Sequence, residues 1–370
     1  MKNLYKYWKY IMKDFWQKEV NKGPLALLAP MDGYWDSAYR QAMKRVAPNV
    51  ICISEFYSAD WLVHSKFLAD AVLPHQTIED PVIIQIFWKD PEMFAKAAKI
   101  ISDPKYNIAG IDINMWCPAK KVVRSGHGSS LLINEETAFQ IVDSLNKATH
   151  LPISVKTRLS FDGNQDLLKF GKWLENAWAT LLTIHGRTAK QAYTWSADWT
   201  NIYELKKHLN IPVVWNGDVL NYDDGIHRMK STNPNGEDLS GFMIGRHSFG
   251  NPWTFLSKSL DNTQNKLIDV NNFVDGLYQP TLSEMLDAME FHAEQLVLTK
   301  WERKGSLEIR KHLVQYIKSF PGVKAYRKRL VTTESFENSQ NVINEIRDVF
   351  KKDLQKRPWL DEIDKDDYDL

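Results

Sequence analysis

Cysteine is scarce in this chain, which has only Cys52 and Cys117 among 370 residues. Two cysteines cannot build the disulfide framework of a small secreted domain, so a reducing compartment is expected. The first seventeen residues mix lysine with aromatic side chains and lack an uninterrupted apolar run. This composition fits neither a secretory signal nor a membrane span. The sequence therefore predicts a cytoplasmic protein with no membrane anchor.

Metal-ligand patterns and net charge are also nearly absent. The ten histidines show no paired spacing such as His-Glu-x-x-His, so no metal site is predicted. The formal net charge is +1, which argues against bulk attraction to nucleic acid. However, ten Lys and Arg residues lie between positions 300 and 330, against Glu302 and Glu308. Such a basic segment is often a solvated helix face, and alone it supports polyanion binding only weakly.

Apolar, β-branched runs are plentiful, and eight of them alternate with helical patterns. They span residues 25–31, 50–56, 81–87, 108–115, 152–158, 180–187, 212–218 and 241–246. This alternation predicts an α/β fold with a parallel sheet, either a (β/α)8 TIM barrel or a doubly wound sheet. The barrel is favoured because every run ends in a polar or chemically capable side chain, and active sites of barrels are built from those strand ends.

The barrel pattern stops near residue 260, where an Asn/Asp-rich stretch is typical of a linker. Helical patterns follow and carry the basic segment. We predict five parts: an N-terminal helical extension (1–22), the catalytic barrel (23–260), a linker (261–280), a smaller all-α domain (281–355) and an acidic tail (356–370).

Cys117 lies where the fourth predicted strand ends, because Pro118 cannot continue a hydrogen-bonded ladder. A basic, glycine-punctuated stretch follows at residues 120–130, which suggests a mobile loop with anion-binding character beside a thiol. From these residues alone, Cys117 is either a reactive thiol or a small buried hydrophobe. Cys52 lies in the middle of a strand and is predicted to be a core residue.

The seventh and eighth strands end in Asn216-Gly217-Asp218 and Gly245-Arg246. Barrels frequently bind a phosphate with the loops after those two strands, because glycine lets backbone N–H groups approach and arginine adds a fixed positive charge. The sequence therefore implies a phosphorylated cofactor.

Seven short motifs, taken together and in order, resemble the tRNA-dihydrouridine synthases. They are Leu28-Ala-Pro-Met31, Gln85-Ile-Phe87, Asn114-Met-Trp-Cys-Pro118, Ser154-Val-Lys-Thr-Arg158, Thr183-Ile-His-Gly-Arg-Thr188, Asn216-Gly-Asp218 and Ile244-Gly-Arg246. The helical part is similar to that family's RNA-binding domain, through residues 310–316 and 320–322, and is most like the bacterial B-type branch. No single motif would be specific, but the match spans the whole barrel.

The resemblance implies bound FMN with NADPH as its reductant, a tRNA partner and, as we expect, a monomer. It assigns cofactor binding to Pro30, Met31, Asp32, Gln85, Lys156, His185, Asn216, Gly217, Asp218, Gly245 and Arg246. The last five would hold the ribityl and phosphate groups. In the implied reaction a hydride passes from the flavin to C6 of a uracil, and Cys117 protonates C5. Asn114 and Arg158 would hold the base, and Arg310 and Lys311 would contact the RNA.

Seven tryptophans stand where the family pattern has glycine. They are Trp61, Trp88, Trp116, Trp178, Trp195, Trp215 and Trp301. Glycine is correspondingly scarce, at 17 of 370 residues, or about 4.6% against a usual ~7%. One hypothesis is that a reassigned UGA codon, glycine in the source organism, has been translated as tryptophan. If the tryptophans are native, the alternative is a catalytically impaired RNA-binding relative. A further alternative is an FMN reductase of dihydroorotate or enone type, although such an enzyme has no evident use for a basic helical appendage.

Overall fold

The computed structural model describes residues 14–117, 126–231, 237–260, 272–274, 276–318, 320 and 322–357. Several predicted segments lie wholly or mostly outside these residues: the first half of the N-terminal extension, most of the basic loop after Cys117, most of the linker and nearly all of the acidic tail. Two compact units are present, one formed by residues up to 34, 51–220 and 224–245, and the other by residues 35–50, 221–223 and 246 onward.

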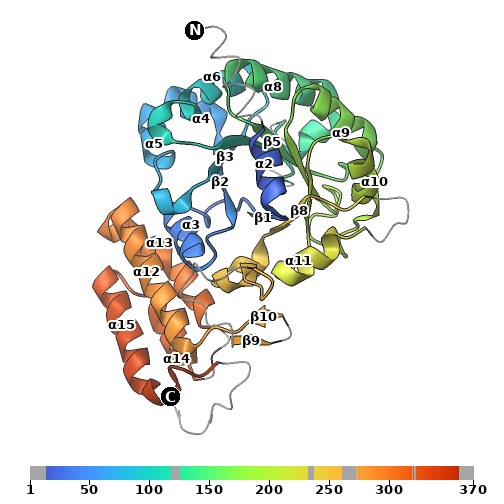
Figure 1. Cartoon of the computed structure of the whole chain (residues 1–370). Coiled ribbons are helices and arrows are strands. Elements are labelled where there is room, and N and C mark those ends of the chain that lie inside the picture. The colour runs from blue at the N-terminus through green and yellow to red at the C-terminus, as the bar shows by residue number, and fades with distance from the viewer. Residues whose placement is uncertain are drawn as a thin grey trace. The chain divides into compact units, whose positions relative to one another are not determined.

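Eight parallel strands close into a barrel in chain order (Figure 1). They are β1 (Leu25–Leu28), β2 (Ile51–Ser58), β3 (Val82–Phe87), β4 (Gly110–Met115), β5 (Ile153–Arg158), β6 (Leu181–His185), β7 (Val213–Asn216) and β8 (Gly241–Ile244). Closure is made by β1 pairing with both β2 and β8. The predicted TIM barrel is confirmed, and the doubly wound alternative is excluded because such a sheet has open edges.

Helices surround this barrel as the periodicity of the sequence predicts. They are α2 (Phe15–Lys22), α4 (Ala59–His64), α5 (Lys66–Val72), α6 (Pro91–Ile101), α8 (Glu135–Ala148), α9 (Leu167–Asn176), α10 (Thr200–His208) and α11 (Tyr222–Met229). Several of these helices begin at a capping side chain. Asp90 accepts from the Glu92 N–H ahead of Pro91, and Asn134 accepts from the Thr137 N–H. Such caps satisfy amide groups that have no partner inside the helix.

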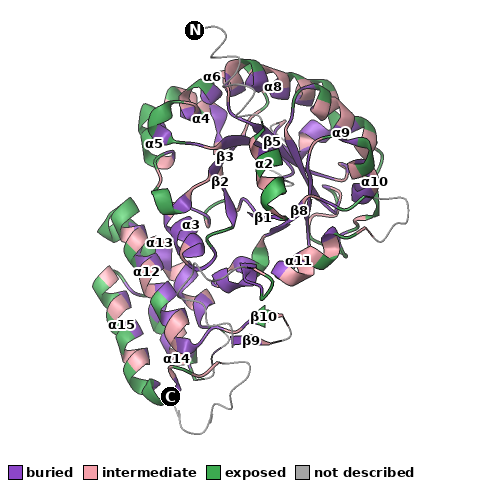
Figure 2. Ribbon diagram, in the orientation of Figure 1, coloured by how far each residue is buried: buried purple, intermediate pink, exposed green. Residues whose placement is uncertain are grey.

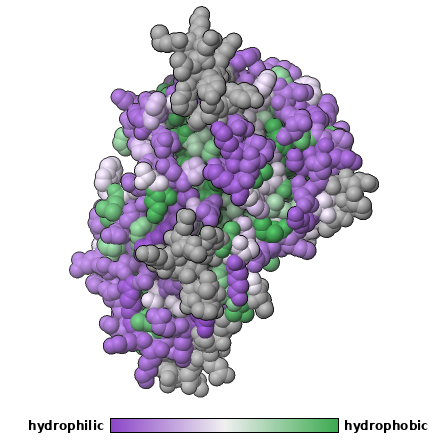
Figure 3. Space-filling view, viewed as in Figure 1, coloured by the Kyte–Doolittle hydropathy of each residue, from purple (hydrophilic) through white to green (hydrophobic). Residues whose placement is uncertain are grey.

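The barrel interior is apolar at its amino end. Trp16 of α2 is buried against inward-facing side chains from several strands, among them Leu25, Leu181 and Val214. In Figure 1, α2 lies across this opening of the barrel. The carboxyl ends of the strands carry the polar side chains instead, so the chemistry is confined to the opposite end. On the face drawn in Figure 3, hydrophilic side chains predominate and apolar ones form small separate groups.

The second unit is helical. It contains α3 (Ser37–Val46), α12 (Leu282–Lys300), α13 (Glu302–Tyr316), α14 (Lys324–Leu330) and α15 (Phe336–Val349), with a small antiparallel pair, β9 (Phe273–Val274) and β10 (Leu277–Tyr278). α3 follows β1 in the sequence, yet it packs on α12, where the Tyr39 and His292 rings lie 5.4 Å apart. Both α12 and α13 carry buried residues along their length, coloured purple on the ribbon in Figure 2.

A buried ion pair joins α3 to α12. Asp36 caps α3 by accepting from the Tyr39 N–H at 3.0 Å, and it also accepts from Lys300 Nζ at 2.6 Å. Lys300 reaches Glu308 of α13 at 2.6 Å as well. Burial alone would raise the pKa of Asp36, but the Lys300 ammonium holds that pKa below its ordinary value. The pair therefore stabilises the folded unit whenever Asp36 is ionised.

We predict that Lys300→Met lowers the free energy of unfolding by about 3 kcal/mol at neutral pH, because Asp36 would keep a buried charge without its cation. Urea unfolding of the full chain measures this difference. Since the folded-state pKa of Asp36 is depressed, the stabilisation is present above the unfolded pKa and is lost as the pH falls through the folded one. Lys304→Met is the control: Lys304 is exposed and lies 3.9 Å from Glu308. An equal loss in the control would contradict the role of the Asp36 pair.

Candidate active site at the carboxyl end of the barrel

Five of the strands bring polar side chains together at their carboxyl ends. The register places Asn114 of β4 beside Lys156 of β5, and His185 of β6 beside both Arg158 of β5 and Asn216 of β7. All five side chains are buried, as is Gln85 of β3. Because the barrel is closed, residues that lie far apart in the sequence converge on one site.

Lys156 lies at the centre of this cluster and is fully buried. Its ammonium nitrogen donates to Asn216 Oδ1 at 2.9 Å, and Asn216 Nδ2 donates to the Met243 carbonyl at 2.9 Å. Burial, together with the positive charge of Arg158, lowers the pKa of Lys156 well below its ordinary value. Lys156 is therefore both a hydrogen-bond donor and a group whose charge responds to what binds near it.

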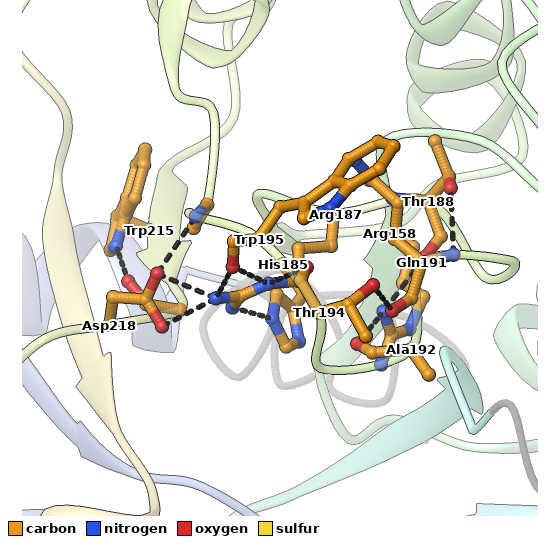
Figure 4. Close-up of polar contacts among 12 residues, drawn as sticks. Arg158, His185, Arg187, Thr188, Gln191, Ala192, Thr194, Trp195, Trp215 and Asp218 are labelled. Carbon is orange, nitrogen blue, oxygen red and sulfur yellow. Dashed lines mark hydrogen bonds and ion pairs between the residues drawn. The ribbon is translucent and has the colours of Figure 1, made fainter.

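Arg187, two residues after His185, organises the loop that follows β6 (Figure 4). Its guanidinium contacts both carboxylate oxygens of Asp218, at 2.8 and 2.7 Å, and the carbonyl of Trp195. It also lies 3.1 Å from His185 Nε2. A guanidinium can only donate, so His185 accepts through Nε2 and carries its proton on Nδ1. Arg187 thus sets the tautomer of His185.

Arg158 is anchored by three backbone carbonyls. Nε donates to the Trp116 carbonyl at 2.8 Å, and Nη1 donates to the carbonyls of Thr188 and Ala192 at 2.9 Å each (the last two contacts are drawn in Figure 4). Burial lowers the pKa of Arg158 to about 10, which leaves the group charged near neutrality. Nη2 is buried and has no hydrogen-bond partner among the described residues.

Asn114 shapes the turn that presents Cys117. Its Oδ1 accepts from the backbone N–H groups of Trp116 and Cys117, at 3.3 and 3.1 Å. Cys117 lies two residues beyond the end of β4 and is 7% exposed, while Cys52 is fully enclosed within β2. Asn114 Nδ2, like Arg158 Nη2, is buried without a partner among the described residues. The prediction that Cys52 is a buried core residue is confirmed.

A polar, planar ligand would fit the atoms left over in this cluster. Gln85 Oε1 is an acceptor, and Asn114 Nδ2 and Arg158 Nη2 are donors; in the part of the chain that is described, each is buried and none has a partner. Leaving such an atom without a partner costs about 1–3 kcal/mol, so a ligand that bonded to these three atoms would recover that cost. All three belong to residues that the family resemblance assigns to the binding of a flavin or a uracil.

Gly217 has a separate structural reason to be glycine. Its φ is +114°, and a Cβ there would lie 2.9 Å from the Ala197 Cβ and 3.0 Å from the His185 ring. Its neighbour Asp218 is already engaged by Arg187 and by the Ala197 N–H, at 2.8 Å. If Asp218 contacts a cofactor, its carboxylate must do so while it also accepts from Arg187 and from the Ala197 N–H.

The Trp116 indole lies beside Lys156 and His185. Lys156 Nζ lies 3.8 Å from the centroid of the indole, and the His185 ring lies 6.2 Å from it. The ring is 6% exposed, and its Nε1 has no partner among the described residues. An aromatic plane thus lies against Lys156 and near His185, two side chains that the family resemblance assigns to cofactor binding.

The remaining predicted residues are placed less tightly. Pro30, Met31 and Asp32 follow β1 and become progressively more exposed, and Gly245 follows β8. Arg246 begins the second unit, so its relation to the barrel site stays a prediction. Arg310 and Lys311 lie in α13, where Arg310 Nε donates to the Thr333 carbonyl at 2.5 Å and so has a structural role besides any contact with RNA.

Two residues that hold side chains of this site are absent from the site predicted by the sequence: Arg187, and Asp112, which accepts from Gln85 Nε2 at 2.6 Å. Arg187 lies in the quoted Thr183–Thr188 motif, so the signal was available, but only its pairing with Asp218 shows what it does. Asp112 lies within an apolar strand pattern and gives no local signal.

In the described ranges, no helix is long and apolar enough to cross a bilayer, and His, Cys, Asp and Glu form no group of three or more suited to a metal ion.

The chain is similar to a group of known proteins over most of its length. The family model for dihydrouridine synthase (Dus) matches residues 27–353. A probable tRNA-dihydrouridine synthase 1 from Synechocystis sp. is 33% identical over 342 residues, covering 89% of this chain and 90% of that protein. The tRNA-dihydrouridine synthase B of Pasteurella multocida is 30% identical over 322 residues, covering 84% and 92%.

A probable tRNA-dihydrouridine synthase from Mycobacterium tuberculosis is 31% identical over 333 residues, covering 85% of this chain and 81% of that protein. Among solved structures, an old yellow enzyme homologue from Zymomonas mobilis aligns with a TM-score of 0.48 at 12% identity, covering 71% of this chain and 94% of that one. This structural similarity is too low to support any conclusion beyond the barrel that the structure itself shows. On the extent of the family match and the identity to its members, the chain belongs to the dihydrouridine synthase (Dus) family.

Proposed function

We propose that this chain reduces uridines in tRNA to 5,6-dihydrouridine, with FMN as its bound cofactor and NADPH as the reductant, in the cytoplasm. The observation that carries the proposal is a pair of buried donors next to Cys117, Asn114 Nδ2 and Arg158 Nη2, which have no partner among the described residues. A uracil presents two carbonyl oxygens, so two donors beside a thiol match its polar edge. The names of the curated relatives support the same substrate.

Gln85, Lys156 and His185 would hold the polar atoms of the isoalloxazine. Pro30, Met31 and Asp32 would border the ring, and Asn216, Gly217, Asp218, Gly245 and Arg246 would hold the ribityl chain and phosphate. Bound FMN, renewed by NADPH, supplies the hydride that C6 of the uracil receives. The role of His185 follows from its tautomer: with Nε2 accepting from Arg187, Nδ1–H is the donor it can offer a ligand.

Cys117 would give a proton to C5 of the base on completion of the reduction. A thiol suits this step because its reference pKa of about 8.5 leaves it mostly protonated near neutrality. The Asn114 carbonyl oxygen fixes the backbone of Cys117, while its amide nitrogen remains for the base. Because C5 and C6 are stacked within folded RNA, the nucleotide must turn out of its stack to reach this buried cluster.

The direct test is to incubate the purified chain with FMN, NADPH and tRNA that lacks dihydrouridine, and to measure dihydrouridine by mass spectrometry of the digested nucleosides. Formation of the product that depends on NADPH supports the proposal. Binding of tRNA without product, by both the unsubstituted chain and its Trp116→Gly variant, would identify a catalytically impaired relative. NADPH consumption with a small enone or orotate, but not with tRNA, would identify a reductase of small molecules.

We predict that the double variant Lys324→Ala/Lys328→Ala weakens tRNA binding about tenfold. The slope of the logarithm of the binding constant against the logarithm of the salt concentration should become shallower by about 1.5, because each lysine that binds a phosphate releases a counterion. Both residues are exposed and lie four positions apart on α14, hence on one face. Filter binding at several salt concentrations measures both quantities. The control is Lys66→Ala/Lys207→Ala, which removes two exposed lysines from barrel helices. Equal losses in the two variants would contradict a specific role for α14.

A further inference from the structure

Asp112 is fully buried inside the barrel, on β4 and one inward position before Asn114. Its Oδ2 accepts from Gln85 Nε2 at 2.6 Å, and its Oδ1 accepts from Ser154 Oγ at 2.6 Å. Burial raises the pKa of Asp112 to about 6, so the group is mostly ionised at neutral pH. An ionised carboxylate only accepts hydrogen bonds.

We propose that Asp112 is a positioning residue that fixes the side-chain amide of Gln85 with its oxygen offered to the bound ligand. An amide beside a carboxylate must turn its nitrogen toward it, and this leaves the oxygen on the other side. Gln85 Oε1 is indeed buried and has no partner in the described part of the chain. The ligand group it would receive is an N–H donor, which the isoalloxazine and the uracil both carry. This assignment rests on the proposed function.

The test is a double-variant cycle in which FMN affinity is measured by fluorescence titration of the full chain after its flavin has been removed. We expect Asp112→Ala and Gln85→Leu each to weaken FMN binding about tenfold, and the double variant to bind no more weakly than Gln85→Leu alone. Asp112→Asn keeps a carbonyl oxygen for Gln85 Nε2 and should restore most of the affinity. Ser154→Ala removes the other hydrogen bond to Asp112 and should change FMN affinity less than Asp112→Ala.

Additive losses in the double variant, or an unchanged affinity in Asp112→Ala, would show that Asp112 does not act through Gln85. Thermal unfolding of each variant identifies a general loss of structure, because such a loss would lower the melting temperature together with the FMN affinity. If the unsubstituted chain and its Trp116→Gly variant both bind no FMN, the proposed function fails, and the role of Asp112 fails with it.

A different observation concerns three exposed tryptophans whose backbone is left-handed. Trp178, Trp195 and Trp301 have φ angles of 76°, 60° and 63°. Trp178 follows α9, where its N–H donates to Glu175 and the Ala179 N–H donates to Leu174. This is the position after a helix where glycine is usual. Trp301 joins α12 to α13 with ψ 160°, a conformation that is essentially confined to glycine.

We infer that the natural protein carries glycine at positions 178, 195 and 301. The three indoles are 63%, 81% and 75% exposed, so burial of their rings does not offset the backbone strain. The tryptophans outside the seven that the sequence singled out contrast with them among the described residues: none has positive φ, and Trp16 and Trp35 are buried core residues. One cause would explain all three positions: the codon UGA is read as tryptophan in one genetic code and as glycine in another. The same explanation applies to Trp116.

The codons of the gene test this directly, together with mass spectrometry of peptides from the native protein. We expect UGA and glycine at positions 116, 178, 195 and 301, and UGG with tryptophan at Trp16 and Trp35. Tryptophan in the native peptides at the three left-handed positions would overturn the inference.

A second test needs no native source. Trp178→Gly and Trp301→Gly in the purified chain should each raise the melting temperature by about 2–4 °C, because they remove backbone strain. Trp61→Gly is the matched control, since Trp61 is 64% exposed but lies inside the helix α4, where glycine is unfavourable. It should lower the melting temperature. A fall in all three variants would contradict glycine as the residue that this backbone requires.

Discussion

Replacing Trp116 with glycine is expected to raise the affinity of the purified chain for FMN by about 100-fold, the largest gain that we predict for any single change. The reason is steric, since the indole lies 3.8 Å from Lys156 Nζ and 6.2 Å from the His185 ring, the two groups proposed to meet the polar edge of the isoalloxazine. A buried indole in a formed cluster cannot be displaced without moving its neighbours, whereas glycine leaves the space open. A 100-fold gain corresponds to about 2.7 kcal/mol.

The visible absorption spectrum of the protein as purified gives the first reading, and titration of the stripped protein with FMN gives the affinity. Trp178→Gly is the control, because Trp178 is exposed, lies just after the end of α9 and is not among the residues of the candidate site. It should stabilise the fold without changing the flavin content. Trp116→Ala should give an intermediate affinity. An unchanged flavin content in Trp116→Gly would show that the indole does not obstruct the cofactor.

The barrel could be predicted from the sequence because its signals are local. Each strand is an apolar run bounded by turn-forming residues, and the helical patterns between these runs correspond to helices such as α6 (Pro91–Ile101) and α8 (Glu135–Ala148). The strand ends were less certain: the run 212–218 contains β7 only as Val213–Asn216. Its last two residues are polar and turn-forming, so they leave the ladder and belong to the site.

The packing of α3 could not be predicted in the same way. This helix, Ser37–Val46, follows β1 as an ordinary part of the strand–helix alternation. Its contacts with α12, through the Tyr39 and His292 rings and the Asp36–Lys300 pair, join residues more than two hundred positions apart. Periodicity gives the apolar face of a helix but does not identify the element that covers that face.

The identities of the site residues followed from motifs, but their hydrogen bonding did not. Nothing in the sequence shows that Arg187 holds both Asp218 and His185, or that Asp112 holds Gln85. These links join different strands and depend on side-chain geometry. The same holds for the tryptophans: the sequence singled out seven positions, and three of them prove to have left-handed backbone while Trp61 is helical.

Replacing Cys117 with alanine is expected to lower the rate of dihydrouridine formation by about 10²–10⁴-fold, the range typical of a lost general acid. FMN affinity should be nearly unchanged, because Cys117 lies beyond β4 in a turn held by Asn114 and is not among the groups proposed to hold the cofactor. Rapid mixing with tRNA measures the rate, and absorption measures the flavin content. Consumption of NADPH without tRNA should persist, since the proposed role of the thiol begins only when a base is bound.

Two variants distinguish an acid from a residue that only shapes the turn. Cys117→Ser keeps the size and the backbone contact with Asn114 but replaces the thiol by a much weaker acid, so turnover should stay low while the fold is preserved. Cys52→Ala removes the other cysteine, which is buried within β2, and should lower stability without a specific loss of turnover. If Cys117→Ser kept full turnover, the proton would have to come from another group. A loss of flavin together with turnover in Cys117→Ala would instead mean that the turn supports the cofactor.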